Sequence, residues 1–153
     1  MEIKYINPFL EALVSTLGQL GIGEVKRGEM RKKERMIVDM DITSIIGLVG
    51  EIRGNIAYSL SQETAKSIVS AMMMGMPVNE LDAMERSALG ELANMITGAA
   101  GVIINNSGTF VDITPPSIIF GEDIYFIISS VDTITIDFDT PFGKIEVNLG
   151  LEV

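Results

Sequence analysis

Hydrophobic residues recur along this chain with two different periods. Over 5–20 they return every three or four positions, the spacing of one helix face, and glycines at 18, 21 and 23 predict where that helix ends. Over 36–42 apolar and polar residues alternate, as they do in a strand. Apolar runs at 45–49 and 55–60, separated by glycines, predict two further strands.

The second half of the chain repeats this order. Ser61 is placed to cap a short helix over 61–74. Asn79, with Asp82 three residues later as a capping-box variant, is placed to cap a longer helix over 79–104. Four strands are predicted after it, with a hairpin connection at 139–143: 110–113, 124–129, 132–138 and 144–151.

Helix, strands, two helices and strands again predict an α+β fold, in which helices gather on one face of an antiparallel or mixed sheet. The length of 153 residues and the 47% hydrophobic content predict one domain, spanning 1–153, with a sizeable core. A long helix followed by strands occurs twice, and 37–43 loosely resembles 110–114. This internal echo is too faint to establish a repeat by itself.

The predicted helix over 79–104 has an unusual polar side. Its core side is expected to carry Ala88, Leu89, Leu92, Ile96, Ala99 and Ile103. Opposite them, a single stripe at i, i+4, i+7 and i+11 holds Ser87, Glu91, Asn94 and Gly98. An ordinary surface helix carries pairs of Lys or Arg with Glu on this side. This stripe instead holds one acid and one amide among small residues.

Glycines accompany the stripe, with Gly98 on it and Gly90 and Gly101 beside it. Each costs about 1 kcal/mol relative to alanine in a helix interior, so a reason for them is expected. Close approach of a partner to this face would explain them. Close packing of a neighbouring element of the same fold explains them equally well, and the pattern alone leaves both interpretations open.

The composition removes several classes of chemistry. The chain has no cysteine and no histidine. Disulfides, Cys/His zinc sites, cysteine nucleophiles and Ser-His-Asp triads are therefore excluded. Any catalysis must use carboxylates, amides, hydroxyls, lysine or groups that a partner supplies.

Charge is unevenly distributed along the chain. Six bases against three acids give residues 24–35 a net charge of +3, which leaves −13 for the rest of a chain whose formal charge is −10. Such an acidic protein is not a general nucleic-acid binder. The basic stretch at 26–35 is interpreted as a solvated loop leading into a strand, in preference to a site for an acidic partner.

The N-terminus and one long apolar stretch bear on where the protein is located. No signal peptide is recognised at the N-terminus, so the cytoplasm is expected. The charge-free stretch at 92–111 is interrupted by asparagines and glycines, and it is not interpreted as a membrane span.

Two other residue groups have structural interpretations. Met72, Met73, Met74 and Met76 are expected to pack in the core and at a helix end. The acidic pairs 39/41, 122/123 and 137/139 are expected to be solvent-facing carboxylates, because no third ligand accompanies them.

The stripe carries a family resemblance. Ser87-x-x-x-Glu91-x-x-Asn94 resembles the D/S-x3-E-x2-N signature of the CheC/CheX/FliY family of chemotaxis phosphatases. Flanking segments at 63–65, 70–73, 75–76 and 111–116 are similar to the CheX branch. The similarity extends in outline over nearly the whole chain, which is identified as a CheX-type domain.

The resemblance implies a phosphatase that hydrolyses the aspartyl phosphate of a CheY-like receiver domain. In the family, the acid docks on a receiver lysine and the amide orients the attacking water, roles that fall here to Glu91 and Asn94. Ser87, Gly90 and Gly98 are expected to contact the partner. No cofactor is expected on this chain, because Mg²⁺ would be held by the receiver.

Relatives of the CheC type carry the motif on two helices. In the first helix here, Glu11 is followed three residues later by Val14, where an asparagine would be required, so one active site per chain is predicted. CheX relatives form homodimers through their sheets, and the regular strand at 144–151 would invite such pairing if it were an uncovered edge.

Two other function classes stay open. One is a non-catalytic flagellar-switch or signalling adaptor that binds a receiver, which a degenerate motif would have favoured over the intact Glu91 and Asn94. The other is a small-molecule phosphatase using the acidic pairs, which lacks a cationic phosphate-binding cluster.

Overall fold

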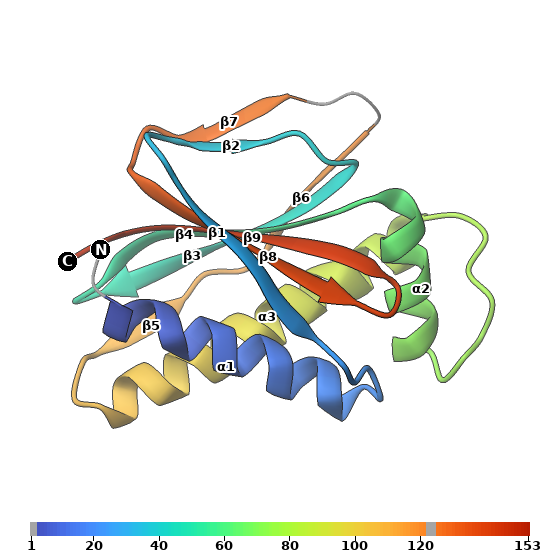
Figure 1. Ribbon diagram of the computed structural model, residues 1–153, viewed down its shortest axis with the longest axis horizontal. Helices are drawn as coiled ribbons and strands as arrows, with labels where there is room; N and C mark the ends of the chain where they lie inside the picture. Colours follow the sequence, from blue (N-terminus) through green and yellow to red (C-terminus); the bar gives the residue numbers. More distant parts are fainter. Residues whose placement is uncertain (1–2, 122–124) are drawn as a thin grey trace.

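The computed structural model describes residues 3–121 and 125–153 (Figure 1). Its elements in chain order are α1 Ile3–Gln19, β1 Lys26–Lys33, β2 Met36–Val38, β3 Ile42–Gly50, β4 Arg53–Leu60, α2 Gln62–Met72, α3 Ala83–Asn106, β5 Val111–Ile113, β6 Ser117–Phe120, β7 Phe126–Ser129, β8 Thr133–Thr140 and β9 Gly143–Glu152. The predicted α+β class is confirmed, and the strand β6 is one that the sequence did not predict.

The main sheet is antiparallel throughout, and its strand order is the same counted in either direction from its centre. Its order is β1-β8-β9-β4-β3, and β5 and β6 both pair with the outer side of β3. Counting outward from the central β4–β9 pair, each direction gives an inner strand and then an edge strand. Each edge strand pairs with an inner strand of the other half of the chain, β1 with β8 and β5 with β3. The two halves are therefore related by pseudo-symmetry, as the family resemblance implies.

The loose resemblance between 37–43 and 110–114 does not mark equivalent places in the fold. Residues 37–43 cover the end of β2, a turn and the start of β3. Residues 110–114 contain β5, an edge strand whose counterpart in the topology is β1. The two segments share composition because both alternate apolar and acidic residues, not because they occupy equivalent places.

Helices and a small ribbon cover opposite faces of the sheet. In Figure 1, α1 and α3 lie side by side under the sheet, and the two-stranded β2–β7 ribbon lies above it. The strand predicted over 144–151 is confirmed as β9, and its Ile145, Val147, Leu149 and Leu151 join the core between the sheet and the helices. On the ribbon side, Met36 and Val38 pack on Ala57 of β4.

A partly buried ion-pair network holds β1 to the sheet. Arg31 donates from both guanidinium nitrogens to Asp137, at 2.8 and 3.3 Å, and lies 3.5 Å from Glu146. Lys144 lies 3.6 Å from the same Asp137 carboxylate. Burial alone would raise the Asp137 pKa, but the hydrogen bond and positive charge of Arg31, with help from Lys144, outweigh it and lower that pKa.

This network corrects two predictions from the sequence. The basic stretch is an edge strand, not a loop, because Arg31 and Lys33 have carboxylate partners on β8 and β9. Asp137 is 6% exposed and is not a solvent-facing carboxylate. Asp41 also has a structural role, since it accepts from the Gln62 N–H at 2.8 Å. The 122/123 pair lies outside the described residues.

Helix starts and the central strand differ in part from expectation. The Ser61 cap is confirmed, since its hydroxyl accepts from the Thr64 N–H at 3.2 Å. The cap of α3 is Asp82, not Asn79, because Glu85 reaches back to the Asp82 N–H at 3.1 Å in a capping box.

The strand over 144–151 is not an edge, because β9 lies between β4 and β8.

The methionine cluster is only partly packed. Met72 and Met73 are half-buried against the core. Met74 is 97% exposed and Met76 is 60% exposed, so the prediction of core packing is wrong for both. The cause is local, because the chain leaves α2 after Met72 and Met74 takes a positive φ of 58°.

Helix α3 is long and apolar enough to cross a membrane on length and composition alone. Half of its most apolar window is buried inside this fold, against the sheet and α1. Its apolar character is thus accounted for by a core position.

Candidate functional site

Two polar contacts set the rotation of α3 about its own axis. The Tyr58 hydroxyl of β4 lies 2.8 Å from Thr97 Oγ1 in the core. Burial raises the pKa of Tyr58 well above its ordinary value, so the hydroxyl stays neutral. Near the end of the helix, Asn105 Nδ2 donates to the Val111 carbonyl at 3.0 Å, and its Oδ1 accepts from the Val111 N–H at 3.2 Å.

The buried side of α3 is turned slightly from the predicted one. Leu89, Leu92 and Ile96 are buried as predicted. Three predicted core residues are only half-buried: Ala88, Ala99 and Ile103. Three residues that the pattern left out are buried in their place: Ala93, Ala100 and Ile104. The sheet and α1 together bury a wider arc than one apolar stripe.

This rotation leaves the predicted stripe accessible. Ser87 and Glu91 are exposed, and Asn94 and Gly98 are half-buried. Glu91 and Asn94 lie about one helical turn apart on the same side. Within residues 3–121 and 125–153, neither side chain has a hydrogen bond or ion pair. The acid and the amide are therefore both available to a partner.

The stripe is longer than the sequence motif. Met84, one turn before Ser87, is 64% exposed, and Val102, one turn after Gly98, is 59% exposed. Exposed apolar side chains thus stand at both ends of the polar pair. Sequence reasoning missed both, although each continues the same three- and four-residue spacing.

Gly90 does not belong to the accessible surface. It is buried, and a Cβ there would lie 3.4 Å from Pro116 Cγ and 3.5 Å from Ile118 Cδ1. Gly101 likewise lies against Val111. The prediction that Gly90 contacts a partner is wrong, and for these two glycines the explanation is packing of the same fold.

Thr114 brings the proline segment to α3. Its hydroxyl accepts from the Gly47 N–H at 2.8 Å, and its own N–H donates to the Gly47 carbonyl at 2.9 Å. These bonds hold the chain between β5 and β6 on β3 while the prolines interrupt the pairing. Pro116 then covers Gly90, and exposed Pro115 lies beside it. The prolines were the sequence signal for this break.

The first helix carries a stripe of identical spacing. Asn7, Glu11, Val14 and Gly18 stand 80 positions before the α3 residues, and all four are exposed. Val14 occupies the place of Asn94 and is 44% exposed. The α1 stripe therefore has the acid and the glycine but not the amide.

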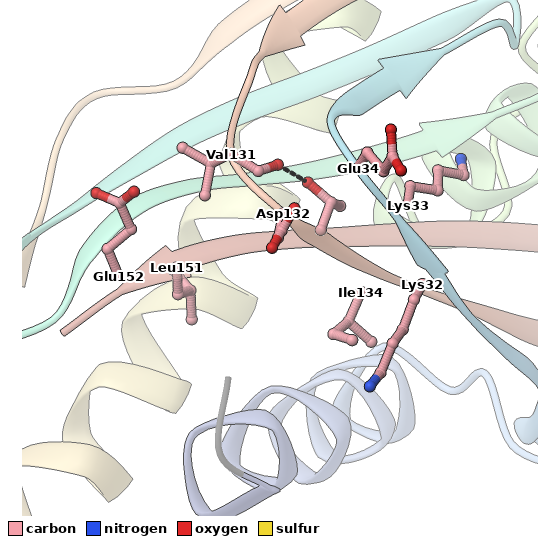
Figure 2. A pocket seen from close by; sticks show the side chains of 9 residues that line it. Lys32, Lys33, Glu34, Val131, Asp132, Ile134, Leu151 and Glu152 are labelled. Carbon is pink, nitrogen blue, oxygen red and sulfur yellow. Dashed lines mark hydrogen bonds between the residues drawn. The ribbon is translucent and has the colours of Figure 1, made fainter.

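A hollow of about 480 Å³ lies where β1 ends, β8 begins and β9 ends. Figure 2 shows the side chains that line it. Lys32 and Lys33 line it together with Glu34, Asp132 and Glu152, a mixture of both charges. None of its lining residues is on α3. Among residues 3–121 and 125–153, no three acidic side chains gather as a metal site would.

Comparisons with known proteins agree with the fold. The family model described as Chemotaxis phosphatase CheX matches residues 42–139, a range that contains all of 87–98. CheY-P phosphatase CheX from Thermotoga maritima is 38% identical over 125 residues, 81% of this chain and 80% of that protein.

Solved structures show the same likeness. A CheC-like superfamily protein from Shewanella sp. PV-4 is similar over 100% of both chains, with a TM-score of 0.89 and 25% identity. A chain of the CheX-CheY-BeF3-Mg²⁺ complex from Borrelia burgdorferi is similar with a TM-score of 0.80 and 28% identity, over 99% of this chain and 100% of that one.

Proposed function

The chain belongs to the CheX family of chemotaxis phosphatases, and from that premise we propose that it accelerates hydrolysis of the aspartyl phosphate on a CheY-like receiver domain. The observation that carries the proposal is the pair on α3. Glu91 and Asn94 are accessible, one turn apart, and without partners among the described residues.

Asn94 orients the attacking water. Its amide oxygen accepts a hydrogen bond from the water, so that a lone pair of the water oxygen faces the phosphorus, a positioning role that a glutamine plays in many GTPases. An oxygen–phosphorus bond forms to the water and the bond to the aspartate oxygen breaks. Inorganic phosphate leaves as H2PO4⁻, which carries both protons of the water, and the receiver carboxylate is restored. No step requires a titrating group on this chain.

Glu91 sets the position of Asn94. Its carboxylate forms an ion pair with a lysine of the receiver. Because Asn94 is one helical turn away, this ion pair fixes how deeply the amide enters the receiver. Ser87 and Gly98 complete the contact, since small side chains let the receiver surface approach α3. Mg²⁺ is held by the receiver, and this chain binds no cofactor.

A homodimer through sheet edges is part of the proposal. Self-pairing of β1 would oppose like charges, because five of its eight residues are basic, so this edge is disfavoured. The outer side of β7 is better suited. Tyr125, Phe126 and Ile127 are 66%, 46% and 46% exposed there. A monomeric mass at micromolar concentration would contradict the dimer.

The assay is decay of a phosphorylated CheY-like receiver with and without this chain. The proposal includes a cytoplasmic location, because a CheY-like receiver is a cytoplasmic substrate. We expect acceleration by the wild-type chain and a loss of at least about 100-fold in Asn94→Ala, because the water is no longer positioned. Asn94→Ala should keep the thermal stability of the wild type and still bind the receiver. Receiver binding without any acceleration by the wild type would replace the phosphatase with a non-catalytic adaptor.

A further inference from the structure

Exposed methionines gather where α3 begins. A surface hollow of about 530 Å³ lies between the end of α2 and the first turn of α3. Met73, Met76 and Met84 line it together with Pro77. Met76 is 60% exposed and Met84 is 64% exposed. Methionine side chains are flexible and polarisable, and they suit surfaces that accept an apolar group from a partner.

The hollow is continuous with the stripe on α3. Met84 precedes Ser87 by three residues and Glu91 by seven, so it lies on the same side of the helix. Along the axis, Met84 and Asn94 are separated by about 15 Å. A domain of about 100 residues has a radius of gyration near 13 Å, comparable with this separation. A receiver of that size that binds at Asn94 therefore extends over Met84.

The rim of the hollow is acidic. Glu80 and Asp82 are both exposed at its edge. Neither has an ion pair among residues 3–121 and 125–153. An apolar floor with an acidic rim matches an apolar side chain that is flanked by lysine or arginine.

We propose that the receiver on which α3 acts also places an apolar side chain, flanked by a basic residue, in the hollow between Met76 and Met84. The inference rests on the proposed function. It adds a second contact, about two turns from Glu91, that determines which receiver binds without taking part in the chemistry.

The test measures binding and turnover separately. The probe is the CheY-like receiver that the wild type dephosphorylates fastest, loaded with BeF3⁻ and Mg²⁺ for binding and with phosphate for turnover. The variant Met76→Ser/Met84→Ser should raise the dissociation constant and the KM by about tenfold while kcat is unchanged. Both side chains are mostly exposed, so thermal unfolding should be unaffected.

Met74→Ser is the matched control, because Met74 is more exposed than either residue but does not line the hollow. It should change the dissociation constant by less than about twofold. Glu80→Lys should slow association with the receiver, most strongly at low salt.

Two outcomes overturn the inference, and they are distinguishable. If the double variant binds the receiver as the wild type does while Asn94→Ala is inactive, the hollow is not a receiver contact and the proposed function stands. If the wild type neither binds nor dephosphorylates any receiver, the proposed function fails and the inference fails with it.

Discussion

The two long helices of this protein occupy equivalent places and present different surfaces. Both lie under the sheet, and both carry an accessible acid, Glu11 on α1 and Glu91 on α3, at the same position of the stripe. Three residues later α1 has Val14 and α3 has Asn94. A pseudo-symmetric fold thus repeats the scaffold of a site without repeating its chemistry.

Their surroundings differ as well. Beside α3, the edge formed by β5 and β6 brings prolines and Ile118 against the helix. At the opposite edge of the sheet, β1 is basic and is held by ion pairs. On α1 itself, Lys4 stands 80 positions before Met84, and it lies seven residues before Glu11 on the same side of the helix. A receiver that offers a lysine to Glu91 would therefore meet a cation beside Glu11. We conclude that the residues flanking the two stripes separate the two surfaces, in addition to the single amide.

The largest effect is expected for β1, the edge strand that ion pairs hold to the sheet. Asp137→Asn removes the main partner of Arg31 and should lower the free energy of unfolding by about 2 kcal/mol, less than for a fully buried pair because Glu146 remains near Arg31. Denaturant unfolding measures it. Phosphatase activity of the folded variant should be unchanged, since α3 is held by other contacts. A large loss of activity in the folded protein would mean that the two halves are coupled.

Asp137 should also make the free energy of unfolding depend on pH in acid. Because the folded-state pKa of Asp137 is lowered, its contribution is fully present above its unfolded-state pKa, about 3.9. It is lost as the pH falls below that value through the folded-state pKa. Unfolding curves of the wild type and Asp137→Asn should therefore converge in acid.

The two acids can be compared directly. Glu91→Gln should raise the KM for the phosphorylated receiver by about tenfold by removing an ion pair across the interface. Glu11→Gln, the matched change on α1, should leave the KM unchanged. Steady-state kinetics distinguishes them, and equal effects of both variants would show that the receiver contacts α1 as well.

Two of the three glycines of α3, Gly90 and Gly98, can distinguish packing within the fold from contact with a partner. Gly90→Ala and Gly98→Ala should each stabilise the helix by up to about 1 kcal/mol, because an added Cβ meets ordinary contacts at both positions. Only Gly98→Ala should weaken receiver binding, by about threefold, because Gly98 lies on the accessible stripe. Calorimetric titration with the BeF3⁻-loaded receiver tests this. Weakening by Gly90→Ala would contradict its burial under Pro116.

The smallest effect is expected where the missing amide is restored. Val14→Asn, in the Asn94→Ala background, recreates the acid–amide pair on α1. It should not recover phosphatase activity, because Lys4 stands beside the α1 stripe where α3 has Met84, and its positive charge opposes the same receiver. Recovery in the receiver-decay assay would show that the one amide was the whole difference between the helices.

Local pattern alone was enough for much of the fold. Helix and strand periods predicted α1, α2, most of α3 and the β8–β9 hairpin, because each depends on residues close in the chain. The Ser61 cap was predictable for the same reason, whereas the true cap of α3 lies three residues after the expected one. The stripe itself follows from helical geometry, so its four residues could be listed before the fold was known.

Which residues on and beside that stripe are accessible was decided only by tertiary contacts. Burial of Gly90 depends on Pro116, which is 26 positions away and is held there by Thr114 and Gly47. The exposure of Met76 and Met84 depends on where α2 ends relative to α3. The strand over 144–151 became central through pairing with β4 and β8. The sequence determined the acid, the amide and their spacing because these are properties of one helix. Their accessibility comes from segments distant in sequence, whose placement depends on non-local burial and pairing.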